Sequence, residues 1–204
     1  MLNLKIKILN NKIYKFINFF IEYIFWKINN SNKYKIPQKI KENFLLNNSV
    51  KKSIWIETGT YLGVTSNVLK KTAIKLYTIE ASRKLYNSLR KNFSQDQNVV
   101  ALFGQSPKFL KKILPHINTN INFFLDAHTV NNNKTLTYKN KTITLPLDDE
   151  LKIIFKHIKN FKKFTIFIDD ISLLGKNKID KLITNCKNLK FKTKFFFNIL
   201  LIRN

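Results

Sequence analysis

The sequence predicts an α/β protein built on a doubly wound, mostly parallel sheet with helices on both faces. Three observations lead to this fold class. After Ser53, short apolar runs rich in β-favouring residues alternate with helical patterns. These runs are apolar at successive positions, as expected for strands covered on both faces. All four glycines of the chain follow such runs and lie in connecting loops.

Five strands are expected before the C-terminal tail, at residues 54–57, 76–79, 98–102, 121–125 and 164–168. The tail, FKTKFFFNILLIRN, is also rich in β-favouring residues. Its pattern fits either one long edge strand or two short strands.

Helix-start signals follow several of these strands. Ser82 is expected to cap one helix, and Ser106 followed by Pro107 is expected to cap the next. Pro146 opens a third helix with acidic residues in its first turn, where they face the positive end of the helix dipole. A last helix is predicted over about residues 177–189.

An N-terminal amphipathic helical extension, residues 1–37, is expected to precede a domain that spans residues 38–204. Its apolar run, residues 13–28, is shorter than the ~20 residues of a membrane span, and Glu22 interrupts it. One interpretation packs this helix on the domain. The other places residues 1–36 in a membrane interface, with lysines against anionic lipid.

The formal net charge of +25 suggests a polyanionic partner, yet only three of the 37 basic residues are arginine. Arginine is preferred for bidentate contacts to phosphates and bases, so nucleic acid is a disfavoured partner here. The single cysteine, Cys186, excludes an internal disulfide. We therefore expect a cytoplasmic protein, or one peripheral to the inner face of a membrane. The sequence indicates no oligomeric state.

The residues that follow the expected strands are unusual for this chain. They are Glu57 and Gly59, Glu80, Gly104 with Ser106, Asp126 with His128, and Asp169, Asp170 and Gly175. Ligands of open α/β sheets bind outside the carboxyl ends of the strands. This rim is therefore the expected site.

The first turn reads E-x-G-x-x-x-G, from Glu57 to Gly63, with Tyr61 and Leu62 between its glycines. A dinucleotide site prefers three glycines as GxGxxG, so that a pyrophosphate can approach the helix. Two bulky residues would crowd that group. The spacing favours a cofactor without phosphates, and Glu80 is placed to bind ribose hydroxyls.

The stretches WIETGTYLGVTS and LYTIEASRKLYNSLRKNF resemble the first two motifs of class I S-adenosylmethionine-dependent methyltransferases, in the catechol-type and macrocin-type O-methyltransferase form. The resemblance covers residues 53 to about 175 and implies a Rossmann-like domain. It implies that Glu57, Gly59, Thr60, Tyr61 and Gly63 shape the methionine end of a cofactor site. Glu80 would hold the ribose, and Gln105 and Ser106 would lie beside the adenine.

The resemblance implies O-methylation of a small-molecule or glycan hydroxyl. Two alternatives stay open: a methyltransferase acting on RNA or another polyanion, and a non-catalytic domain that binds S-adenosylmethionine. The sequence motifs describe the cofactor better than the acceptor.

Asp126, Asp169 and Asp170 are expected at adjacent strand ends, where three carboxylates repel unless a cation neutralises them. Oxygen ligands suit Mg²⁺, and the catechol-type enzymes hold a metal at matching positions. Their lysine base is absent from the residues after Asp126, so His128 is the candidate base, with a structural histidine as the alternative. Residues 129–145 are expected to form a small hairpin over the acceptor site.

Overall fold

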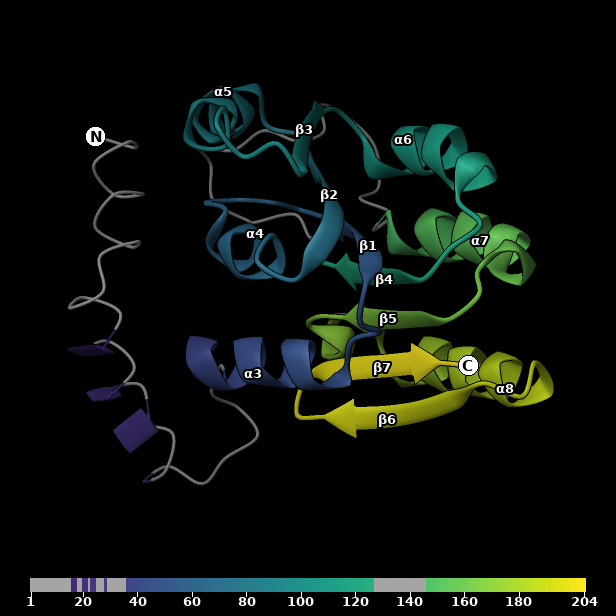
Figure 1. Cartoon of the computed structure of the whole chain (residues 1–204). Coiled ribbons are helices and arrows are strands. Elements are labelled where there is room, and N and C mark those ends of the chain that lie inside the picture. The colour runs from purple at the N-terminus through teal and green to yellow at the C-terminus, as the bar shows by residue number, and fades with distance from the viewer. Residues whose placement is uncertain (1–15, 18–19, 22, 25–27, 29–35, 127–145) are drawn as a thin grey trace, which may run out of the picture.

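The computed structural model describes residues 36–126 and 146–204, together with residues 16, 17, 20, 21, 23, 24 and 28. Its centre is a seven-stranded sheet with the order β3-β2-β1-β4-β5-β7-β6 (Figure 1). Strands β1 to β5 are parallel, and β7 runs antiparallel to both of its neighbours. The strands are β1 Ser53–Thr58, β2 Ala73–Glu80, β3 Val99–Phe103, β4 Ile121–Leu125, β5 Phe164–Ile168, β6 Lys192–Phe196 and β7 Ile199–Arg203. The doubly wound, mostly parallel sheet is therefore confirmed.

Helices cover both faces of this sheet (Figure 1). One face carries α3 Gln38–Asn48, α4 Val64–Leu69 and α5 Arg83–Asn92, and the other carries α6 Ser106–Ile113, α7 Leu147–His157 and α8 Lys176–Asn188. Short 3-10 turns follow at η1 Leu114–His116, η2 Ile158–Asn160 and η3 Ile171–Leu174. Because β4 and β5 are buried along their whole length, both faces need an apolar cover.

The largest apolar clusters on the two faces of the sheet differ in size. On the α6–α8 face, residues such as Phe123, Leu151 and Ile166 belong to one large buried cluster. On the α3–α4 face, Trp55 stacks on Phe167 with ring centroids 5.9 Å apart. The sheet is thus held rigidly from both sides, which fixes the positions of its strand ends.

The structure decides one alternative that the sequence left open and corrects one expectation, the Ser106 cap. The tail forms two antiparallel strands, because the chain reverses at Phe197, whose φ is 51°. Helix α6 is capped at Gln105 and begins at Ser106, so Ser106 is its first residue. The Ser82 cap is confirmed, since its hydroxyl accepts a bond from the Leu85 N–H.

Helix α3 was not predicted from the sequence. It begins after Pro37 and buries Phe44 and Leu45 against the sheet. The Phe44 ring stacks on Phe196 at a centroid distance of 4.0 Å. A helix from the N-terminal part of the chain therefore packs beside the C-terminal hairpin (Figure 1).

The expected rim does form at one edge of the sheet. Backbone bonds continue the ladder past the strand ends, from Gly59 N to Ile79 O (3.0 Å), from Asp126 N to Thr58 O (3.1 Å) and from Asp169 N to Leu125 O (3.0 Å). These residues therefore lie side by side, although they are far apart in the sequence.

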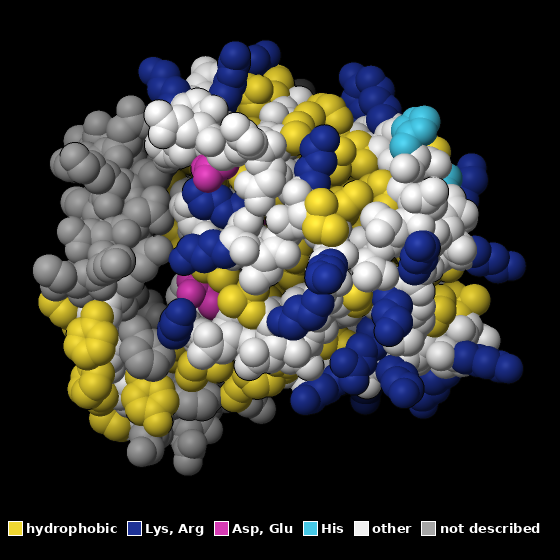
Figure 2. All heavy atoms as spheres, in the orientation of Figure 1, with side chains coloured by type: hydrophobic (Ala, Val, Ile, Leu, Met, Phe, Trp, Pro, Cys, Tyr) yellow, Lys and Arg dark blue, Asp and Glu magenta, His cyan; other side chains and the backbone are white. Residues whose placement is uncertain are grey.

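Among the described residues, no helix is long and apolar enough to cross a membrane. In the N-terminal segment the side chains of Phe16, Ile17, Phe20, Ile21, Ile24 and Ile28 are exposed. Apolar side chains gather at the lower left of Figure 2, whereas Lys and Arg side chains are spread over the visible face.

Candidate cofactor and acceptor site

The turn after β1 is a tight loop that needs left-handed backbone at three positions. The φ angles are 78° at Gly59, 52° at Tyr61 and 73° at Gly63. Gly63 N donates to Thr60 O over 2.9 Å, which closes the turn, and α4 begins at the next residue. A left-handed conformation costs glycine nothing, and it brings backbone rather than side chain to the rim.

Close packing is a second reason for glycine at position 63. A Cβ added there would lie 2.7 Å from Leu89 Cδ2 and 3.1 Å from Phe93 Cζ. Both contacts come from α5 or its C-terminal end, so Gly63 lets α4 and α5 meet. The two glycines of the turn therefore serve its conformation and its packing together.

Glu80, the last residue of β2, is fixed by the same turn. Its Oε2 accepts a bond from Tyr61 N over 2.8 Å, and its Oε1 accepts one from Ser82 N over 2.7 Å. Burial raises the pKa of Glu80, and the backbone N–H groups of Ser82, Tyr61 and Ala81 partly oppose that rise. A carboxylate fixed in this way can still accept further hydrogen bonds, because it has about four lone-pair sites.

A buried hydrogen-bond network lies beneath the turn. Glu57 Oε2 accepts bonds from Ser66 Oγ and, over 2.6 Å, from Thr78 Oγ1. The Thr78 hydroxyl also meets the Thr60 hydroxyl at 2.5 Å. Burial raises the pKa of Glu57 to about 7, although both hydroxyl bonds lower it. Glu57 Oε2 and the Thr60 hydroxyl are therefore engaged within this network.

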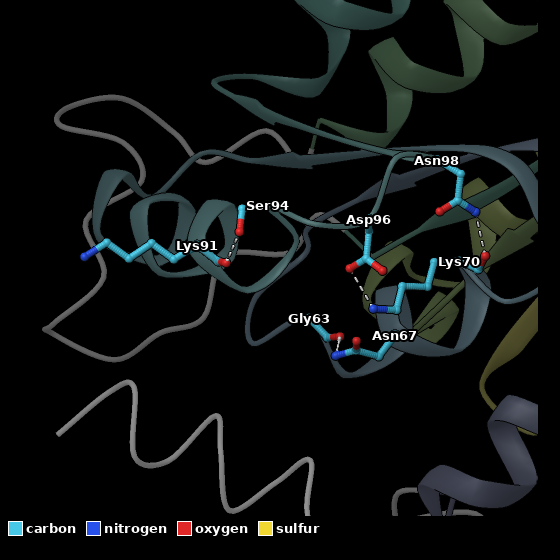
Figure 3. Close-up of polar contacts among 7 residues, drawn as sticks. All are labelled: Gly63, Asn67, Lys70, Lys91, Ser94, Asp96 and Asn98. Carbon is cyan, nitrogen blue, oxygen red and sulfur yellow. Dashed lines mark hydrogen bonds and ion pairs between the residues drawn. The ribbon is translucent and has the colours of Figure 1, made fainter.

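The far end of α4 is anchored as well (Figure 3). Lys70 Nζ forms an ion pair with Asp96 Oδ2 at 2.7 Å, and Asn98 Nδ2 donates to Lys70 O over 2.8 Å. Near the start of the helix, Asn67 Nδ2 donates to Gly63 O over 2.9 Å. The short helix that carries the glycine turn is therefore tied to the α5–β3 connection.

The residues expected beside an adenine differ from each other in exposure. Gln105 is exposed at the end of β3, whereas Ser106 is buried. The Ser106 hydroxyl donates to Glu150 Oε1 of α7, so it joins two helices on the α6–α8 face. The base contact of Gln105 stays a prediction, and the Ser106 hydroxyl has a protein partner.

The acidic rim contains a cation that sequence reasoning missed. Lys41 of α3 forms an ion pair with Asp169 Oδ2, and the two side chains are only 15% and 9% exposed. Burial by itself lowers the pKa of Lys41, but Asp169, Asp126 and Asp170 outweigh it and raise the pKa. Burial raises the pKa of Asp169, which Lys41 opposes.

The structure does not support the predicted magnesium site. Within residues 36–126 and 146–204, no three His, Cys, Asp or Glu side chains form a group that could hold a metal ion. The ammonium group of Lys41 lies on Asp169, and Asp170 Oδ1 accepts a bond from Asn198 Nδ2 over 2.9 Å. Asp126 is half-buried at the end of β4. The candidate base His128 and the expected hairpin at 129–145 lie outside the described residues.

No protein-family model and no curated protein sequence matches this chain. Solved structures do match its fold. A candidate methyltransferase of Streptococcus mutans, SMU.1697c, solved with S-adenosylhomocysteine, has a TM-score of 0.52 at 18% identity over 83% of this chain and 97% of its own. The strand order and this match decide the fold. The chain has the class I methyltransferase fold.

Two further neighbours of this methyltransferase fold differ in the acceptor that their names give. A candidate caffeoyl-CoA O-methyltransferase of Staphylococcus aureus has a TM-score of 0.54 at 14% identity, covering 91% of this chain and 90% of its own. The 23S rRNA methyltransferase ErmE has a TM-score of 0.56 at 14% identity, covering 83% of this chain and 68% of its own. The fold is therefore shared by proteins with unlike acceptors.

Proposed function

We propose that this chain is an S-adenosylmethionine-dependent methyltransferase that methylates a hydroxyl group of a small-molecule or glycan acceptor. The fixed carboxylate of Glu80 carries this proposal. It lies at the end of β2, held by Tyr61 N and Ser82 N, where this fold places an acid for ribose hydroxyls.

The turn from Glu57 to Gly63 would receive the methionine end of the cofactor. S-adenosylmethionine supplies an electrophilic methyl group on a sulfonium when bound. Left-handed backbone at Gly59 and Gly63 allows close approach, while Tyr61, 47% exposed, leaves little room for a pyrophosphate. The network under Glu57 keeps this turn in place before any ligand arrives, which lowers the entropy cost of binding.

The acceptor would lie beyond β4 and β5. Removing a proton from the acceptor hydroxyl makes its oxygen a better nucleophile, and we assign that role to His128 and a supporting role to Asp126. The proposed reaction uses no metal ion, because the Lys41 ammonium already lies among the carboxylates of this rim.

Incubation of the protein with cell extract and S-adenosylmethionine labelled in its methyl group tests the function. Label in a small-molecule or glycan fraction supports the proposal. Label in RNA would instead support the alternative, a methyltransferase that acts on RNA or another polyanion. The affinity of the protein for RNA should then fall steeply as the salt concentration rises. Cofactor binding without any transfer would indicate a non-catalytic domain. Glu80→Ala should abolish transfer, and the exposed Asp148→Asn serves as the matched control.

We also propose that residues 1–36 contact an anionic membrane surface. The exposed side chains Phe16, Ile17, Phe20, Ile21, Ile24 and Ile28 recur at helical spacing, and the Phe16 and Phe20 rings lie 6.2 Å apart. These side chains are between 42% and 73% exposed. An interfacial helix of this kind combines an apolar face with lysines that attract anionic lipid.

Sedimentation with vesicles of phosphatidylcholine and phosphatidylserine tests the membrane contact. The full chain should sediment, and a chain without residues 1–36 should stay in solution. Vesicles of phosphatidylcholine alone should bind more weakly, since the lysines lose their counter-charge. Equal sedimentation of both chains would contradict a membrane contact through residues 1–36.

A further inference from the structure

The acidic rim obtains its positive charge from a distant part of the sequence. Lys41 lies on α3, 128 positions before Asp169, and its ammonium group is ion-paired with Asp169 Oδ2. The ammonium also lies 5.1 Å from the centre of the Phe124 ring. Both contacts hold Lys41 at the carboxyl ends of β4 and β5, on the acceptor side of the site.

The charged groups around Lys41 come from three neighbouring strands. Asp126 follows β4, Asp169 and Asp170 follow β5, and Glu57 lies in β1. Carboxylates gathered in a partly dehydrated site repel one another unless a cation lies among them. Lys41 supplies that cation.

Packing fixes the helix that carries Lys41. Phe44 and Leu45, on the next turn of α3, belong to the same buried cluster as Phe124 and Phe167. The Phe44 and Phe167 rings lie 5.9 Å apart in an edge-to-face arrangement. The backbone at Lys41 therefore cannot leave the rim without moving a helix out of the core.

We propose that Lys41 is the resident cation of this rim and takes the place of a divalent metal ion, so that methyl transfer proceeds without bound metal. This inference rests on the proposed function. Lys41 is a positioning residue: it holds Asp169 and keeps α3 over the acceptor side of the site. Mg²⁺ can bind two acceptor oxygens at once, whereas an ammonium on Asp169 offers no such coordination. The acceptor therefore does not need two adjacent oxygens.

Binding of Mn²⁺, followed by the electron paramagnetic resonance signal of the free ion, tests the proposal without requiring activity. The wild type should bind Mn²⁺ at this rim only weakly, without reaching one equivalent. Lys41→Met removes the ammonium and should bind Mn²⁺ at least about tenfold more tightly, because a nearby like charge is lost. K41M/D169N should lose the gained binding, since one carboxylate is neutral.

Two outcomes would overturn the proposal. One is stoichiometric Mn²⁺ binding by the wild type that disappears in Asp169→Asn. The other is equal Mn²⁺ affinity of the wild type and folded Lys41→Met. The first outcome needs no Lys41 variant, so the proposal stays testable if Lys41→Met does not fold.

Calorimetry with S-adenosylhomocysteine on the same samples separates this inference from the proposed function. A wild type that binds neither Mn²⁺ nor S-adenosylhomocysteine would contradict the function and leave the Lys41 assignment intact. A wild type that binds both would support the cofactor site and overturn Lys41 as the resident cation.

Discussion

The two halves of the rim are assembled in different ways. The cofactor half, formed by the ends of β1 and β2, is local in sequence. Glu57, Gly63 and Glu80 lie within 24 consecutive residues, and Glu80 accepts a hydrogen bond from Tyr61 N of the glycine turn. The acceptor half, formed by the ends of β4 and β5, depends on Lys41 from α3. A motif can encode the first half, whereas only the folded chain brings the second half together.

A single substitution in the acceptor half should lower the free energy of unfolding most. Lys41→Met leaves Asp169 buried without its cation, and breaking such a pair typically costs about 3–5 kcal/mol of unfolding free energy. Urea denaturation measures this loss.

Lys70→Met is the matched control for that change. Lys70 also pairs with an aspartate, Asp96, and lies 5.2 Å from the centre of a phenylalanine ring, but the paired side chains are 22% and 27% exposed. We expect a loss of about 1 kcal/mol or less, because solvent screens the pair. Equal losses for the two variants would contradict the burial of the Lys41 charge.

Glu57, in the cofactor half, should make the stability of the fold depend on pH. Its pKa is about 7 in the folded protein, against a model-peptide value near 4.5 when unfolded. As pH rises between these values, the unfolded state loses its proton first, so Glu57 stabilises the fold less. The loss is on the order of 3 kcal/mol.

Thermal unfolding at pH 5 and pH 8 measures this effect. Glu57→Gln stays neutral, so its stability relative to the wild type should increase from pH 5 to pH 8. A difference that does not change with pH would show that Glu57 ionises normally in its buried network.

A smaller effect separates conformation from packing in the glycine turn. Gly63→Ala places alanine in the left-handed α region, with a Cβ 2.7 Å from Leu89 Cδ2. The left-handed backbone alone costs about 1–2 kcal/mol of unfolding free energy. We expect Gly63→Ala to lose about 1–2 kcal/mol more than that, because Leu89 and Phe93 must move. In a Leu89→Ala background the added Cβ has more room, so the loss from Gly63→Ala should be smaller. An equal loss in both backgrounds in chemical denaturation would exclude the packing role.

How much the sequence predicts follows the same division. Apolar runs separated by helical patterns predict the parallel strands, which the structure confirms, and β4 and β5 are buried along their whole length. The structure also bonds Glu80 to the glycine turn through Tyr61 N, while the cofactor contacts of both stay a prediction. The Ser106 hydroxyl could not be placed, because its partner Glu150 lies 44 residues away on another helix.

Helix α3 and Lys41 were missed for a physical reason. The helix has no side-chain cap and no acidic first turn, and its burial depends on contacts with β4, β5 and β6. Pro37 followed by Ile40, Phe44 and Leu45 is the signal that was present. Three aspartates at neighbouring strand ends predict a metal site when they are considered alone. Sequence spacing does not show that folding brings a lysine to them.

Calorimetric titration with S-adenosylhomocysteine, in the presence of a chelator, tests the central claim most directly. The wild type should bind one equivalent, and Glu80→Ala should bind at least about tenfold more weakly, because the ribose loses a charged acceptor. Asp148→Asn, at an exposed ion pair on α7, should bind like the wild type. No binding by the wild type, or unchanged binding by Glu80→Ala, would contradict the cofactor site.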